Sequence, residues 1–221
     1  MQTLDRLKRQ PIVLDENTHK YYHRPTKQVM ENTVTGVLWA LKPQAAKDAI
    51  ERTKSEWEFK GKDVHNVFAD FLADKDLIYW PEHEPYVTPL FEHKFIQEFQ
   101  PLASEFLMCD PSISLGGSFD ALGIWREKLV LIDLKTQKKK NEYSTNAQLG
   151  GYLHLLKVTT GIVPDEVRTV WARPGETKVG KNQGTIACSH AWTEAWNRFQ
   201  SEHSFTWISS ASWGEIELEG V

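Results

Sequence analysis

The strongest constraint on the fold of this chain is a short apolar run, Leu-Val-Leu-Ile at residues 129–132, that leads directly into Asp-Leu-Lys. A run of this length without polar alternation predicts a strand buried on both faces. Because alternate residues of a strand point to the same side, Asp133 and Lys135 share one face and Leu134 points into the core. The pattern thus predicts an acid and a lysine side by side on a buried strand.

A second strand is predicted just upstream, over residues 113–125, where glycines interrupt it and indicate a bulge or a close backbone approach. The polar residues 126–128 form the expected hairpin turn, which brings Asp120 beside Asp133. Two carboxylates that close repel each other unless a cation lies between them. An oxygen-rich ligand set suits Mg²⁺ or Mn²⁺ better than zinc, so we expect a hard divalent cation here.

Two further residue pairs have helical spacing. Gly61 and His65 lie on a helix predicted over residues 45–74, on a stripe whose small residues let another element approach the histidine. Gln148 and Tyr152 lie one turn apart on a helix predicted over residues 144–158. A surface or core histidine, and a simple packing and hydrogen-bonding couple, are the alternative interpretations of these pairs.

The combined pattern is more specific than its parts. It consists of Gly-x-x-Asp ending at Asp120, twelve residues, Asp-x-Lys at 133–135, and Gln-x-x-x-Tyr on the following helix. This combination resembles the PD-(D/E)XK nuclease superfamily, and more closely its RecB-like branch, which includes the mitochondrial genome maintenance exonuclease and many phage exonucleases. The resemblance covers roughly residues 61–156. It implies an α/β fold with a restriction-endonuclease-like core, in which helices flank a mixed central sheet.

The resemblance also implies a ligand set for one or two Mg²⁺ or Mn²⁺ ions. The side chains of His65, Asp120 and Asp133 and the backbone carbonyl of Leu134 match the positions that bind metal in that branch. His65 corresponds to the histidine of its Gly-x-x-x-His helix motif. Such a cation supplies Lewis-acid chemistry for phosphodiester hydrolysis.

Further catalytic roles follow from the same comparison. Lys135, beside the metal-binding Asp120 and Asp133, is expected to position the attacking water and to stabilise charge on the phosphate. Glu105 matches the acid on the preceding strand, which ligates the metal or orients a water. Gln148 and Tyr152 are expected to hold the nucleic-acid strand or the catalytic lysine.

The two cysteines, Cys109 and Cys188, argue against one group of relatives. The CRISPR-associated nucleases of the branch hold an iron–sulfur cluster on four cysteines, which this chain lacks, so we expect no such cluster. Unpaired cysteines are typical of a reducing compartment, and no segment has the apolar length of a membrane span or of a signal-peptide core. These features predict a cytoplasmic protein without membrane contact, in the host cytoplasm if it is phage-encoded.

The formal net charge of −4 disfavours a protein that coats duplex DNA through a broad basic surface. Lys138, Lys139 and Lys140 form, with Lys135, the dense basic run of the chain. Because this run directly follows the catalytic strand, it contacts phosphates in one interpretation and forms an ordinary solvated loop in the other.

The 221 residues suit one nuclease domain with a sizeable core. We divide it into an N-terminal β-meander and short helix (1–43), a catalytic core (44–172), and a C-terminal hairpin and helix (173–221). A polar loop is predicted over residues 81–89 and a helix over 89–100. Trp192 and Trp196, one helical turn apart, are expected in the core rather than as a base-stacking platform.

The expected function is a metal-dependent DNA exonuclease. Single-stranded ends are the substrate that the resemblance implies, with phage-type DNA processing in replication or recombination and a protein of those pathways as a further partner. Three alternatives stay open: an endonuclease for branched or sequence-defined DNA, a non-catalytic nucleic-acid-binding protein on a decayed nuclease fold, and cleavage of RNA.

Overall fold

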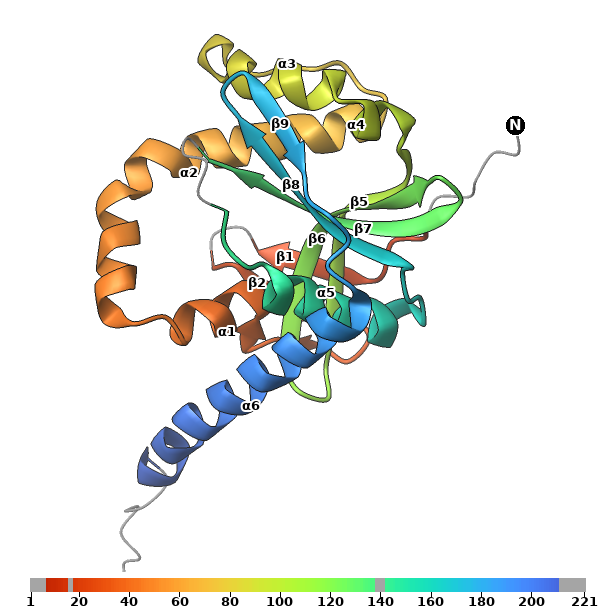
Figure 1. Cartoon of the computed structure of the whole chain (residues 1–221). Helices are drawn as coiled ribbons and strands as arrows, with labels where there is room; N and C mark the ends of the chain where they lie inside the picture. The colour runs from red at the N-terminus through yellow and green to blue at the C-terminus, as the bar shows by residue number, and fades with distance from the viewer. Residues whose placement is uncertain (1–6, 16–17, 138–141, 211–221) are drawn as a thin grey trace, which may run out of the picture.

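The computed structural model describes residues 7–15, 18–137 and 142–210, with side chains described up to His203 (Figure 1). Its strands fall into two sheets. A small antiparallel sheet holds β1 (Ile12–Asp15), β2 (Lys20–His23) and β3 (Gln28–Val29). The predicted N-terminal β-meander is therefore confirmed.

The central sheet has six strands, and five of them follow the order β4-β6-β7-β8-β9. The sixth, β5, pairs along the length of β6, whereas β4 and β7 pair with its opposite ends. Their bounds are β4 (Asn32–Thr33), β5 (Gln100–Asp110), β6 (Leu115–Trp125), β7 (Lys128–Thr136), β8 (Glu166–Arg173) and β9 (Glu176–Val179). The β4–β6 and β7–β8 pairs are parallel, and the other pairs are antiparallel. The sheet is mixed, as predicted.

The hairpin between β6 and β7 has an unusual turn sequence. Trp125 pairs with Lys128, so Arg126 and Glu127 form a two-residue loop, with φ values of 48° and 63°. Positive φ at both positions defines the turn that fits the right-handed twist of the strands, normally made by Asn-Gly. Pairing of the two apolar strands holds Arg126 and Glu127 in a backbone conformation that residues with long side chains seldom adopt.

Helices cover both faces of the central sheet (Figure 1). One layer contains α1 (Val34–Ala40), α5 (Asn146–Thr160) and α6 (Thr185–Ser210). The other contains the later part of α2 (Gln44–Leu72) with α3 (Glu84–Glu92) and α4 (Lys94–Glu98). Leu131 packs into the first layer and its neighbour Ile132 into the second, which is the alternation of a doubly covered strand.

Several local predictions can be compared with these elements. Thr33 caps α1 by accepting a hydrogen bond from the Gly36 N–H at 2.9 Å. Leu134 is fully buried, and Trp192 packs in the core, as predicted. The predicted polar loop over residues 81–89 is wrong: a short 3₁₀ turn, Pro81–His83, leads directly into α3. Pro81 and Pro85 lie in the first turns of these two helices, where a backbone N–H has no intrahelical partner, so the missing N–H of proline costs nothing.

No helix in the described part of the chain is long and apolar enough to span a membrane. Both cysteines are buried. Cys109 packs beneath the small sheet, and Cys188 lies on α6, where α6 contacts α5. Burial raises the pKa of each thiol to about 11. They therefore behave as small core residues.

Candidate metal centre

Three acids lie in one row across three neighbouring strands. The pairs on either side of Glu105 and Asp120 place these two residues opposite each other on β5 and β6. Pairing between β6 and β7 stops at Ala121 and Ile132, one step before Asp120 and Asp133 would meet. The antiparallel hairpin thus brings the predicted carboxylates together and adds Glu105 from the third strand.

The sheet is irregular at this row. Phe119 and Ala121 are two residues apart on β6 but pack on opposite faces of the sheet, so the strand twists at Asp120. On β5, Glu105 has a φ of 45°, a left-handed conformation that costs a non-glycine residue about 1–3 kcal/mol and is frequent at functional sites. The irregularity turns the carboxylates of neighbouring strands toward a common point.

The side chain of Asp120 also accepts a hydrogen bond from the backbone of the neighbouring strand. Its Oδ2 accepts a hydrogen bond from the Leu134 N–H at 2.5 Å, beyond the last β6–β7 backbone pair. The N–H and C=O of one strand residue point to the same edge, so the Leu134 carbonyl lies on the edge that faces Asp120. The role of the Leu134 carbonyl as a metal ligand stays a prediction.

His65 reaches the acids from α2. Its Nδ1 lies 3.0 Å from Asp120 Oδ1, and a ligand atom from each of His65, Glu105 and Asp120 lies within 4.8 Å of the others. Gly61, one turn earlier, lets α2 approach β7: a Cβ there would lie 3.3 Å from Thr136 Oγ1. In the Gly-x-x-x-His pattern, the glycine therefore allows α2 to come close to the sheet, and the histidine contacts Asp120.

Asp133 and Lys135 share a face, as predicted, and Lys135 Nζ donates to Asp133 Oδ1 at 2.8 Å. Asp133 is only 1% exposed, yet its Oδ2 has no hydrogen-bond partner among the described residues. A buried carboxylate oxygen without a partner is costly unless a cation or a water satisfies it. Asp133 lies beside the cluster of His65, Glu105 and Asp120, whose one imidazole and two carboxylates suit Mg²⁺ or Mn²⁺.

Burial and neighbouring charges shift the pKa of each of the three acids in the row. Burial, followed by the charge of Asp120, raises the pKa of Glu105 to about 7. Burial also raises the pKa of Asp133 to about 6, against the lowering effect of Lys135. For Asp120, burial favours the neutral acid, but His65 and Lys135 outweigh it and lower the pKa. A cation at this point would allow all three acids to ionise.

Gln148 and Tyr152 face the same site from α5. Gln148 Nε2 donates to the Tyr152 hydroxyl at 2.8 Å, so the predicted pair forms. Burial and the charges of Asp133 and Asp120 raise the pKa of Tyr152 well above its ordinary value. Gly117 permits this approach, because a Cβ there would lie 2.9 Å from a methyl group of Leu155 and 3.6 Å from the Tyr152 ring.

Two residues near the site were not identified from the sequence. Tyr143 is 58% exposed and rests edge-on against Trp171, with ring centroids 5.2 Å apart. Trp171 is the β8 partner of Lys135, so Tyr143 lies near the lysine. Arg9 lines a cleft beside Glu105. No motif signals either residue, because tertiary packing alone brings them here. Lys138, Lys139 and Lys140 lie outside the described residues.

Comparison with known proteins identifies the family of this chain. No curated protein matches the chain. Among solved structures, the crystal structure of SSO0001 is similar, with 15% sequence identity, a TM-score of 0.35, and coverage of 79% of this chain and 80% of that one. The family model of the PD-(D/E)XK nuclease superfamily matches residues 28–210, which include every acid of the row, His65 and Lys135. This chain therefore belongs to the PD-(D/E)XK nuclease superfamily.

Proposed function

We propose that this protein is a Mg²⁺- or Mn²⁺-dependent deoxyribonuclease that digests single-stranded DNA from its ends. The observation that carries the proposal is the convergence of His65, Glu105 and Asp120 on one point beside the buried Asp133–Lys135 pair. A divalent cation bound there would polarise a phosphodiester and activate water for its hydrolysis. The intact acid and lysine set argues against a decayed, non-catalytic fold.

Each residue has a separate task in this proposal. His65, Asp120, Asp133 and the Leu134 carbonyl hold the cation, and Glu105 either joins them or orients the attacking water. Lys135, held by Asp133, presents its ammonium group to the attacking water and to the phosphate oxygens as charge develops there. The Gln148–Tyr152 pair supports the strand or the lysine from the α5 side.

Exposure of the site favours a single strand over an intact duplex. The side chains of Asp120 and Lys135 are only 14% and 17% exposed, and that of Asp133 is 1% exposed. A scissile phosphate must therefore enter a recess, which an unpaired strand does more readily than a stiff double helix.

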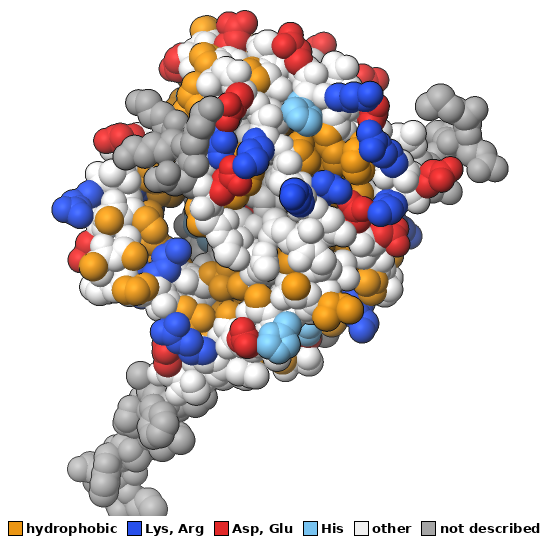
Figure 2. All heavy atoms as spheres, in the orientation of Figure 1, with side chains coloured by type: hydrophobic (Ala, Val, Ile, Leu, Met, Phe, Trp, Pro, Cys, Tyr) orange, Lys and Arg blue, Asp and Glu red, His pale blue; other side chains and the backbone are white. Residues whose placement is uncertain are grey.

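On the face in Figure 2, basic and acidic side chains are interspersed rather than separated, unlike the broad basic surface of a protein that coats duplex DNA. The preference for ends rests on the likeness to RecB-like exonucleases, and processing during phage-type replication or recombination is the setting that this likeness suggests.

Digestion of labelled linear and circular single strands tests this function. We expect loss of the linear strand alone with Mg²⁺ or Mn²⁺, and no loss with EDTA. Asp133→Asn should abolish cleavage, whereas the control Asp76→Asn, an exposed acid outside the site, should keep it. Cleavage of the circle would identify an endonuclease instead, and equal loss of an RNA strand would remove the restriction to DNA. Retained cleavage by Asp133→Asn would refute the site.

Cation binding can be measured without any reaction. Mg²⁺ or Mn²⁺ should raise the midpoint of thermal unfolding, because a ligand at a hundredfold excess over its Kd stabilises the native state by about 2.7 kcal/mol. Glu105→Gln and Asp133→Asn should each reduce this shift, and Asp76→Asn should leave it unchanged. Equal shifts in all variants would place the cation elsewhere.

A further inference from the structure

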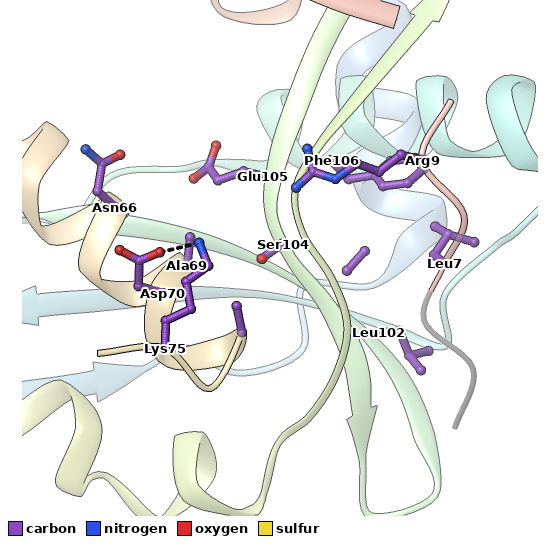
Figure 3. A pocket seen from close by; sticks show the side chains of 12 residues that line it. Leu7, Arg9, Asn66, Ala69, Asp70, Lys75, Leu102, Ser104, Glu105 and Phe106 are labelled. Atoms are coloured by element: carbon purple, nitrogen blue, oxygen red, sulfur yellow. Dashed lines mark hydrogen bonds and ion pairs between the residues drawn. The ribbon is translucent and has the colours of Figure 1, made fainter. Parts of the chain in front are cut away.

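A cleft of about 500 Å³ opens between α2 and β5, immediately beside the acid row. Figure 3 shows Glu105 and Asn66 at one end, Asp70 and Lys75 along α2, and Arg9 and Leu7 on the opposite side. Its volume lies within the roughly 300–1,000 Å³ of pockets that hold small ligands. A substrate strand that passes the metal centre on this side must enter this cleft.

The N-terminal segment forms one wall of the cleft. Within the described chain, β5 pairs with β6 on only one of its edges, and the Leu7 N–H bonds to the Leu102 carbonyl at 2.9 Å on this outer strand. This contact fixes the segment along β5 and directs the nitrogen-bearing end of Arg9 toward β5 and Glu105 (Figure 3). The charge of Arg9 accordingly lowers the pKa of Glu105, against the larger effect of burial.

Among the described residues that line this cleft, Arg9 is the cation without a hydrogen-bond or ion-pair partner. Its exposed side chain makes no hydrogen bond or ion pair with the described residues, whereas Lys75 Nζ is paired with Asp70 at 2.8 Å. The guanidinium therefore keeps its donors available for an anion, in a fork that matches phosphate oxygens. Leu7, Leu102 and Ala73 give the same cleft apolar lining, suited to a sugar or a base.

We propose that this cleft binds the nucleotide next to the scissile phosphate and that Arg9 contacts the phosphodiester of that nucleotide. The proposal rests on the nuclease function proposed above and adds the path of the strand on one side of the site. A backbone contact of this kind is independent of base sequence, as digestion of arbitrary DNA requires. Arg9 lies outside residues 28–210, which match the family model, so the contact belongs to an N-terminal segment beyond the shared core.

Binding of a fluorescent single-stranded oligonucleotide in EDTA, over a range of salt concentrations, tests the proposal without cleavage. Loss of one phosphate contact from a single strand reduces the slope of log K against log salt by about 0.7. We expect Arg9→Ala to bind more weakly with this reduced slope and Arg9→Lys to keep the slope. Lys8→Ala, which removes the same charge from a neighbour that does not line the cleft, should resemble the wild type.

Two outcomes would overturn the assignment. The first is an unchanged slope in Arg9→Ala, and the second is a wild-type protein that binds no oligonucleotide at low salt. If Arg9→Ala keeps the slope and also loses the metal-dependent rise in thermal stability, Arg9 acts on Glu105 alone. Cleavage by the wild type is scored separately: an inactive protein with Arg9-dependent binding would refute the nuclease proposal and leave the strand contact in place.

Discussion

At the residue scale, Asp120 joins the elements of the site. Its carboxylate accepts the Leu134 N–H of β7, contacts His65 of α2, and lies opposite Glu105 of β5. The sequence predicts that Asp120 and Asp133 are neighbours, because a short hairpin brings them together. It does not predict the bond to Leu134, which exists only because the β6–β7 backbone pairing ends one residue earlier.

Lys135 provides the sharpest test at this scale. Replacement by Met keeps the length of the side chain and removes its charge, so we expect the cleavage rate to fall by about 10²–10³-fold, as for loss of one preorganised donor in other enzymes. Single-turnover cleavage measures this effect. Lys128→Met on the same strand, where the lysine side chain is 55% exposed, is the matched control and should cleave normally. A Lys135→Met protein as fast as this control would remove the lysine from the mechanism.

At the scale of elements, the distance between α2 and β7 sets the position of His65. Residues 44–60 of α2 are exposed or half-exposed, and its fully buried side chains begin at Val64. The helix therefore contacts the sheet mainly through its later half, beginning where Gly61 faces Thr136. The helical spacing of apolar residues predicts this buried stripe, but the closeness of the contact depends on the neighbouring strand.

Substitution of Gly61 tests this contact. Gly61→Ala should change stability little, because a gain of about 1 kcal/mol in helix propensity offsets the tight 3.3 Å approach to a rotatable hydroxyl. Gly61→Val should cost about 1–3 kcal/mol by overpacking and should slow cleavage by displacing His65. Urea unfolding and cleavage assays measure both effects. Ala49→Val, on the exposed half of α2, measures the propensity cost of valine relative to alanine, and an equal difference in stability between Gly61→Ala and Gly61→Val would exclude packing as the cause.

The same scale contains the main failure of the sequence-based prediction. Prolines at positions 81, 85 and 89 suggest a loop, but α3 begins at Glu84 and continues through Pro89. Burial of Tyr86, Val87 and Leu90 against the later half of α2 favours the helix. Tertiary packing thus outweighs the local preference, which no single-sequence argument can weigh.

At the scale of the whole molecule, the central sheet separates two cores, and the acid row lies where strands change face between them. Asp110, at the end of β5, connects the sheet to the α5 layer. Its Oδ2 bonds His154 Nε2 at 2.8 Å, and its Oδ1 accepts from the Ser112 hydroxyl at 2.5 Å. Burial alone would raise the pKa of Asp110, but these hydrogen bonds outweigh burial and lower it.

A lowered acid pKa gives a definite pH dependence. The stabilisation is present above the ordinary pKa of 3.8 and is lost as the pH falls through the still lower folded-state pKa. Asp110→Asn should therefore be less stable than the wild type by about 2 kcal/mol near neutrality, a typical cost for hydrogen bonds to a charged group. Urea unfolding between pH 7 and pH 3 should show this gap narrow below about pH 4. A gap that widens in acid would contradict the assigned role, and Asp76→Asn should show no gap.

The family, the mixed sheet, and the shared face of Asp133 and Lys135 could all be predicted from sequence, because strand periodicity and motif spacing are local and translate directly into geometry. The sequence also placed His65, Glu105, Gln148 and Tyr152 as candidates. Three features come from tertiary packing: Glu105 lies opposite Asp120, one oxygen of Asp133 has no partner among the described residues, and Arg9 borders the cleft. These facts depend on strand register, on burial and on contacts between segments far apart in the chain, which local patterns do not specify.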